Sequence, residues 1–188
     1  MKRLSAILVM GWAMQIGFVG AMVNYPEEIP FVPTPIEVVD QMLELAEVKK
    51  GDIVYDLGSG DGRIVIRAAK KYGARGIGIE MDRTLIDKAR KSAQAEGISH
   101  LVEFRVEDAL KTDISPATVV TLYMLPWFNE AMKPNFQKYL KPGSRIVAHD
   151  FGIEGWTPVK RKNYPRSNTE AAATSTNTSS TCGKSIRI

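Results

Sequence analysis

Apolar side chains recur along this chain at two spacings that alternate with each other. Between Ile36 and Ala46 they recur every three or four residues, as on one face of a helix. Ile53 to Leu57 is instead a short, mostly apolar run with strand character. The alternation predicts further strands at 76–80, 102–106, 117–125 and 144–149, and helices at 64–72, 83–96 and 127–139, the last with Pro134 as a point of interruption. Strands alternating with helices predict an α/β fold with a mostly parallel sheet and helices on both faces.

The pattern stops at both ends of the chain. Residues 24–35 include four prolines, which exclude a regular helix and favour an extended arm. From residue 159 the sequence turns polar, and Ser167 to Ser185 is mostly Ser, Thr, Asn and Ala without an apolar period. This composition predicts a disordered tail over 159–188. The folded domain is therefore expected at 36–158.

Residues 1–23 have the pattern of a targeting segment. Lys2 and Arg3 precede an almost uncharged stretch that runs to Val23, as in a signal peptide, and cleavage after Ala21 fits the small residues there. The stretch is about 20 residues long, so an uncleaved membrane anchor fits as well. A buried N-terminal helix is the third interpretation. We expect export or membrane anchoring, with an anchored domain on either membrane face, the cytoplasmic one included.

A glycine-rich turn joins the first predicted strand to the helix after it. Gly58, Gly60 and Gly62 let the backbone turn sharply and come close to a ligand. The helix that follows presents free N–H groups and the positive end of its dipole, which suit an anionic group. Because such a turn is also an ordinary connection, its meaning depends on the acids around it.

Three carboxylates lie where a nucleoside cofactor needs them. Glu80 ends the second strand about twenty residues after the loop, where an acid can accept hydrogen bonds from a ribose. Asp108 follows the third strand and can accept one from an adenine amino group. Asp56 precedes the first glycine and can hold an ammonium. The alternatives are a helix-capping acid at Glu80 and a solvated turn at Asp108.

The charges around the loop separate two classes of cofactor. A dinucleotide fold prefers a third glycine at position 63 and avoids negative charge beside the pyrophosphate. This chain has Arg63 at that position and acids at Asp56 and Asp61. They suit a ligand with an ammonium and a sulfonium but no phosphate, such as S-adenosylmethionine (SAM). A nucleotide-cofactor oxidoreductase is the alternative, and a surface ion pair with Arg63 is the alternative for Asp61.

The loop and its companions resemble the class I, Rossmann-like SAM-dependent methyltransferases. The resemblance covers about 30–158 and rests on the runs Val54–Ile64, Gly78–Glu80 and Glu107–Asp108. Val32–Pro35 before the first helix and Trp156–Pro158 after the last strand are similar to the ATP synthase c-subunit lysine methyltransferase family and its bacterial relatives. That branch implies SAM as the cofactor and a protein lysine as the methyl acceptor.

The resemblance also implies the residues of the site. The cofactor-binding residues would be Asp56, Gly58, Ser59, Gly60, Asp61, Glu80 and Asp108. The acceptor side would be bordered by Pro33, Thr34, Leu125 and Pro126. Tyr123 and His149 end two strands at the edge where parallel sheets bind ligands, which makes them candidates for catalysis. Core packing of Tyr123 and a hydrogen-bonded structural role for His149 are the alternatives.

One departure from the family stands at the C-terminus. Class I methyltransferases end with a strand hairpin, and the polar tail takes its place here. We therefore expect a sheet that lacks its last hairpin and leaves an edge exposed. That would make a non-catalytic SAM-binding module a further alternative function.

Composition narrows the remaining choices. A chain of 188 residues suits one domain. The net charge of +4 comes largely from 160–166 and the last few residues, so no basic face is expected on the domain and nucleic acid is not an expected partner. Cys182 is the single cysteine, which excludes an intrachain disulfide and a Cys-rich zinc site, and no metal is expected. The oligomeric state stays undetermined.

Overall fold

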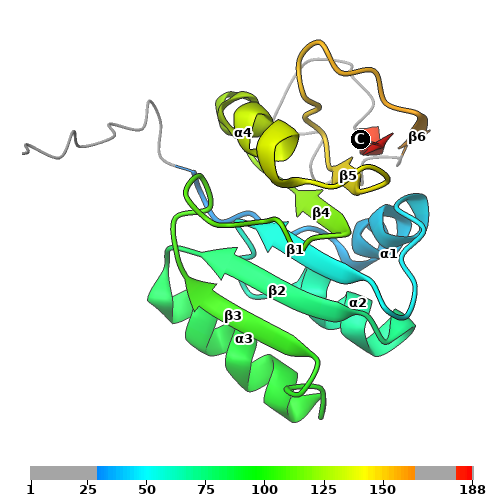
Figure 1. The fold of residues 1–188 in the computed structure, drawn as a ribbon. Helices are drawn as coiled ribbons and strands as arrows, with labels where there is room; N and C mark the ends of the chain where they lie inside the picture. The colour runs from blue at the N-terminus through cyan, green and yellow to red at the C-terminus, as the bar shows by residue number, and fades with distance from the viewer. Residues whose placement is uncertain (1–28, 164–180, 188) are drawn as a thin grey trace, which may run out of the picture.

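The computed structural model describes residues 29–163 and 181–187, which form one seven-stranded sheet with helices on both faces (Figure 1). The sheet order is β3-β2-β1-β4-β5-β7-β6. The strands are β1 Ile53–Leu57, β2 Arg75–Glu80, β3 Val102–Val106, β4 Val119–Leu122, β5 Arg145–Ala148, β6 Lys160–Asn163 and β7 Thr181–Arg187. The helices are α1 Ile36–Leu45, α2 Arg63–Tyr72, α3 Arg83–Ala95 and α4 Pro126–Tyr139. Strands β1 to β5 pair in parallel, and the order reverses direction between β1 and β4.

The helices cover the two faces unequally. Buried side chains of α1, α2 and α3 pack with Val54, Val119 and Val147 on one face. On the other face, α4 and the loop before β4 pack with alternate residues of the same strands, among them Tyr55 and Val120. The period of two along each strand therefore supplies both cores. This arrangement confirms the predicted parallel α/β sheet with helices on both faces.

The predicted elements are confirmed with small shifts of their ends. The fourth strand is shorter than expected, because only 119–122 pair with β1 and β5. Pro134 lies inside α4 and does not end it. Residues 29–35 have no regular secondary structure, as expected for the proline-rich arm, whose first residues lie outside the described part.

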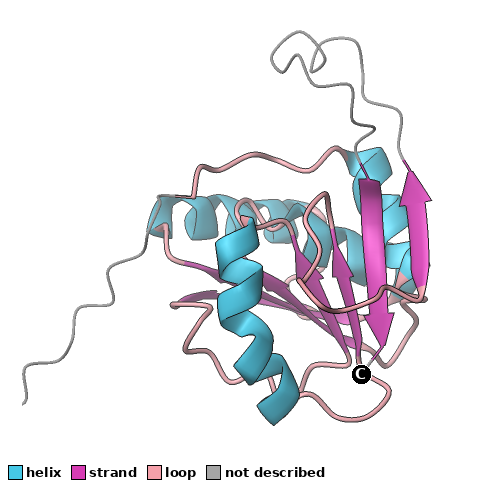
Figure 2. Cartoon of the chain, turned by 90° about the horizontal axis from the view of Figure 1, so that it is seen from above, coloured by secondary structure: helices cyan, strands magenta, loops and turns pink. Residues whose placement is uncertain are grey.

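The expectation that the last hairpin is missing is wrong. Strand β7 pairs antiparallel with β5, and β6 pairs antiparallel with β7, as the two strands at the right of Figure 2 show. Residues 160–163 and 181–187 are therefore strands and not tail, while 164–180 lie outside the described residues. The strands escaped prediction because β6 is the fully polar sequence KRKN, exposed along its length. Main-chain hydrogen bonds build a ladder without an apolar period.

The predicted targeting segment, 1–23, lies outside the described residues. Within 29–163 and 181–187, no helix has the length and apolar character needed to cross a bilayer.

Candidate active site

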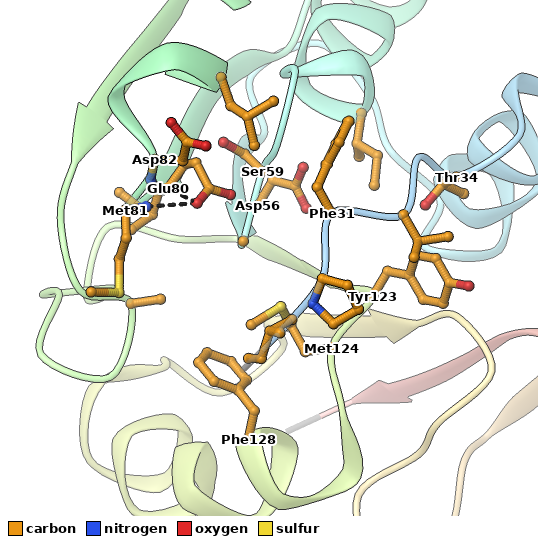
Figure 3. A pocket seen from close by; sticks show the side chains of 18 of the residues that line it. Phe31, Thr34, Asp56, Ser59, Glu80, Met81, Asp82, Tyr123, Met124 and Phe128 are labelled. Atoms are coloured by element: carbon orange, nitrogen blue, oxygen red, sulfur yellow. Dashed lines mark hydrogen bonds between the residues drawn. The ribbon is translucent and has the colours of Figure 1, made fainter. Parts of the chain in front are cut away.

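A cavity of about 800 Å³ opens at the carboxyl ends of β1, β2 and β4, under the proline-rich arm. Its size falls within the range of roughly 300–1,000 Å³ typical of cofactor and small-ligand sites. It lies at the point where the strand order reverses, where open α/β sheets bind ligands. Figure 3 shows carboxylates such as Asp56 and Glu80 on one side and Tyr123, Met124 and Phe128 on the opposite side.

Asp56 is the most deeply buried acid of the cavity wall. Only 2% of its surface is exposed, and the Thr121 hydroxyl on β4 donates to its Oδ1 at 2.6 Å. Burial raises the pKa of Asp56 to about 7; the negative charges of Glu80 and Asp61 add to the rise and the Thr121 hydrogen bond opposes it. A cation beside Asp56 would relieve this penalty, so the residue suits the ammonium of SAM.

The glycine loop is held against β2 through its backbone. The amides of Gly58 and Ser59 both donate to the Ile79 carbonyl, at 2.9 and 2.8 Å. Ser59 is 5% exposed, lines the cavity, and its hydroxyl makes no hydrogen bond with the described protein. A buried hydroxyl without a partner is costly, and a polar ligand group in the cavity would satisfy it. The loop therefore fits the methionine part of SAM.

Glu80 closes the loop from the end of β2. Its Oε2 accepts from the Gly60 amide at 3.0 Å, and its Oε1 accepts from the amides of Met81 and Asp82 at 2.8 and 3.0 Å. A carboxylate has about four lone-pair positions, so one remains for a ribose hydroxyl. Glu80 thus shapes the loop and also faces the cavity.

Replacing Glu80 with alanine should weaken SAM binding at least about tenfold, because the loop loses its anchor and the ribose loses an acceptor. Isothermal titration of SAM measures the change. The matched control is Glu103→Ala on β3, whose carboxylate pairs with Arg105 and does not line the cavity. An unchanged affinity in Glu80→Ala would contradict the assignment.

Asp61 faces the cavity and is paired at the same time. Arg63 donates to both of its carboxylate oxygens, from Nε at 2.9 Å and from Nη2 at 2.7 Å, and the Lys88 Nζ lies 3.4 Å away. The hydrogen bonds from Arg63 lower the pKa of Asp61 in spite of its burial. The ion pair with Arg63 that was the alternative for Asp61 is present, and Asp61 also lines the cavity.

Asp108 and its apolar neighbours form the part of the cavity where the adenine is predicted to bind. The Asp108 side chain accepts from the Leu110 amide at 3.0 Å and pairs with the Lys111 Nζ at 3.0 Å. Met81 and Ala109 line the cavity beside it, and Met81 is largely exposed. A flat heterocycle here would have apolar contacts and a carboxylate for its amino group. Adenine binding by Asp108 stays a prediction.

The opposite end of the cavity is aromatic. Tyr123, Trp127, Phe128 and Phe151 line it, and the rings of Trp127 and Phe128 meet edge to face at 5.8 Å. His149 does not line the cavity but packs behind Tyr123, with 4.1 Å between the ring centroids.

The structure gathers most of the predicted site residues around this one cavity. The predicted residues that line it are Asp56, Gly58, Ser59, Asp61, Glu80, Asp108, Pro33, Thr34, Leu125 and Tyr123. Gly60, Pro126 and His149 do not line it. The amide of Gly60 is bonded to Glu80 instead, and Pro126 begins α4.

Several lining residues were not predicted, among them Phe31, Met81 and Phe151. Phe31 lies over Gly60, and an aromatic side chain between prolines was a usable signal for it. Met81 follows Glu80 directly and was equally open to prediction. Phe151 had no sequence signal, since its place depends on the turn at Asp150, which has a φ of 57°, and on Asn129, whose side-chain amide donates to the Phe151 carbonyl at 3.2 Å.

A parallel sheet of this order, with an acid-lined cavity over a glycine loop and no dinucleotide pattern, defines a class I SAM-dependent methyltransferase. The chain belongs to the ANTKMT methyltransferase domain family, which matches residues 56–160. SAM is accordingly its cofactor.

Individual relatives agree with this assignment. The chain is 44% identical over 136 residues to a protein-lysine N-methyltransferase of Saccharolobus islandicus (strain REY15A), covering 72% of this chain and 84% of that protein. It is 32% identical over 130 residues to the lysine N-methyltransferase of the ATP synthase c-subunit from Homo sapiens. That match covers 69% of this chain but only 55% of the human protein.

A crystal structure described as an RNA methyltransferase from Salinibacter ruber in complex with S-adenosyl-L-homocysteine (SAH) superimposes with a TM-score of 0.74 at 48% identity. The match covers 84% of this chain and 94% of that one. None of these three relatives supports the oxidoreductase alternative.

Proposed function

We propose that the enzyme methylates the ε-amino group of lysine in a protein. The observation that carries the proposal is the uncharged, aromatic end of the cavity across from the cofactor loop, and the charge of the rest of the wall supports it. Of the described residues that line the cavity, six are acids: Asp56, Asp61, Glu80, Asp82, Glu107 and Asp108. Arg63 is the one basic residue among them, and it is paired with Asp61. Such a wall favours cationic ligands and disfavours a phosphate backbone.

The aromatic end of the cavity suits the chemistry of a lysine acceptor. SAM when bound supplies a methyl group that its sulfonium has already activated. A free lysine has a pKa of about 10.4 and must lose its proton before it can attack. Apolar surroundings disfavour the charged amine and lower that pKa. Trp127, Phe128 and Met124 provide such surroundings and exclude water, so the enzyme mainly aligns and desolvates the acceptor.

Tyr123 is the proposed contact with the acceptor amine. It follows β4 directly, lines the cavity and lies across from the cofactor loop (Figure 3). The His149 ring packs against the Tyr123 ring at a tilt of 39°. The alternative role of His149 as a general base stays a prediction, since its side chain does not border the cavity.

RNA is the competing acceptor, because the Salinibacter ruber relative is described as an RNA methyltransferase. The full chain, incubated with tritiated SAM and a cell extract, distinguishes the two. We expect label that resists nuclease, is removed by protease, and maps to methyl-lysine by mass spectrometry. Glu80→Ala serves as the impaired enzyme and Glu103→Ala as its matched control. Label that disappears with ribonuclease would overturn the lysine proposal.

SAM affinity should depend on pH through Asp56. With a pKa near 7, the free carboxyl is largely protonated below pH 7, and it must lose that proton to hold an ammonium. Affinity should therefore fall as the pH drops below 7, by up to about tenfold per pH unit, with about one proton released per SAM bound. Titration in buffers of different ionisation enthalpy measures the proton release, and Asp56→Asn should abolish it.

The same group has the opposite effect on the stability of the ligand-free protein. Its pKa in the folded state lies above the ordinary value of 3.8, so folding disfavours the charged form. The stability contribution of Asp56 is therefore fully present below pH 3.8 and is lost as the pH rises through 7. A protein whose SAM affinity and ligand-free stability are both constant between pH 5 and 8 would contradict both statements.

We also propose that residues 1–23 direct the chain to export or to a membrane face. The support is the sequence of Lys2 and Arg3 before an almost uncharged stretch that runs to Val23. N-terminal sequencing and membrane fractionation of the natively produced protein test it. An intact N-terminus in a fraction free of membranes would overturn it.

A further inference from the structure

The arm that covers the cavity includes residues that cannot donate main-chain hydrogen bonds. Residues 29–34 all line the cavity, and the prolines among them have no N–H to donate. Phe31 packs on the glycine loop so closely that a Cβ at Gly60 would lie 2.3 Å from its ring. Phe31 is nonetheless 45% exposed. Packing of this ring alone therefore leaves the arm weakly held.

Besides the packing of Phe31, the Arg63 guanidinium joins the arm to the loop in the described part of the chain. Arg63, the first residue of α2, donates from Nη1 to the Thr34 carbonyl at 2.8 Å. Its Nε and Nη2 atoms donate to the two carboxylate oxygens of Asp61. Thr34 and Asp61 are both buried, and both line the cavity. The planar fork of arginine makes all three bonds at once, which the single ammonium of a lysine cannot reproduce.

We propose that Arg63 is a positioning residue that transmits occupation of the cofactor loop to the arm, and so fixes the wall against which the acceptor binds. Asp61 lies on the cofactor side, Thr34 lies on the acceptor side, and the Arg63 guanidinium lies between them. When SAM or SAH orders the loop around Asp61, the bonds of Arg63 to Asp61 and Thr34 order the arm as well. The proposal rests on the use of SAM and not on the identity of the acceptor.

Chymotrypsin cleavage of the arm tests the coupling in the full chain. The bond after Phe31 is the reporter, and the fragment beginning at Val32 is quantified by mass spectrometry with and without SAH. In the wild type, SAH should slow this cleavage. In Arg63→Ala, cleavage should be about tenfold faster, as expected when a charge-assisted hydrogen bond that closes a local opening is lost, and SAH should no longer slow it.

Arg67→Ala is the matched control. Arg67 lies one turn further along α2 and holds both carboxylate oxygens of Asp40 at 2.8 and 2.7 Å, away from the cavity. The Arg67→Ala variant should be cleaved at the wild-type rate, and SAH should still slow its cleavage. Equal cleavage in the two variants, or no effect of SAH on the wild type, would overturn the proposal. A thermal unfolding midpoint for each variant separates arm opening from global unfolding.

Steady-state kinetics provide a second readout. With the labelled acceptor, Arg63→Ala should raise the acceptor KM about tenfold and change kcat less than about threefold, since binding is affected and the chemistry is not. Because coupling is reciprocal, SAH affinity in Arg63→Ala should fall by about the factor by which SAH slows arm cleavage in the wild type, while Arg67→Ala should bind SAH as the wild type does. A loss confined to kcat would contradict a positioning role. If the wild type labels no protein, the lysine proposal fails, while the cleavage test of Arg63 still gives its answer.

Discussion

Replacing Arg145 with methionine should lower the free energy of unfolding by about 3–5 kcal/mol, the usual cost of removing one partner of a buried ion pair. Arg145 begins β5 and is buried against Asp52, with which it forms an ion pair. Its Nη1 also donates to the carbonyls of Ala46 and Glu47, both at 3.0 Å. The variant therefore leaves a buried carboxylate and two carbonyls without their cation. Urea denaturation measures the loss.

Asp52 explains why the loss should be large. Its burial alone would raise its pKa, but hydrogen bonds from Thr118 and Arg145 lower the pKa overall. Adding Asp52→Asn to the methionine variant should recover part of the stability, because the unpaired charge is gone. Arg67→Ala removes a partly exposed pair and should cost less, about 1 kcal/mol. Similar losses in Arg67→Ala and the methionine variant would refute a special role for the buried pair.

Replacing Gly62 with alanine should destabilise the fold by about 2–5 kcal/mol, from a left-handed backbone and an overpacked core together. Gly62 has a φ of 77°, and a Cβ there would lie 2.5 Å from the Phe104 ring and 2.8 Å from the Ala89 Cβ. Both neighbours are buried and cannot move away easily. SAM affinity should fall together with the stability, since Gly62 connects the glycine loop to the first residue of α2.

Gly97→Ala separates the two causes. Gly97 has a φ of 70°, similar to that of Gly62, but a Cβ there would meet no atom within 4 Å. Gly97→Ala should lower the free energy of unfolding by only about 1–2 kcal/mol, the cost of the left-handed backbone alone. Thermal or urea unfolding of the two variants side by side gives the packing contribution as the difference. Equal losses of unfolding free energy in the two variants would mean that the Phe104 ring moves aside without a cost in stability.

The sequence predicted the cofactor end of the site because its residues are fixed by strand ends. Asp56, Glu80 and Asp108 each lie at or near the end of a parallel strand, and such ends meet at one edge of the sheet. Once the strands were placed by their apolar pattern, these side chains had to converge. The cavity between them confirms that convergence, although the ligand contact of each residue stays a prediction.

Contacts between distant segments could not be predicted in this way. Asp52 and Arg145 are 93 residues apart, and no local pattern marks them as partners. The bond from Arg63 to Thr34 uses a main-chain carbonyl, which leaves no trace in the residue type. The β6–β7 hairpin was missed for a related reason, because its pairing is carried by backbone groups and the exposed residues of β6 carry no apolar period.

The sheet order has a consequence for the time at which the fold can close. Strand β7 lies between β5 and β6, although it follows both of them in the chain. Among the described strands, β6 pairs with β7 alone, so it has no place in the sheet until 181–187 have been made. During synthesis, strands β1 to β5 and the cofactor loop are made before β7. Until β7 is made, β5 presents an unpaired edge. An open edge is a template for pairing with other chains, so a nascent chain in which β7 has not yet paired with β5 exposes a site of aggregation.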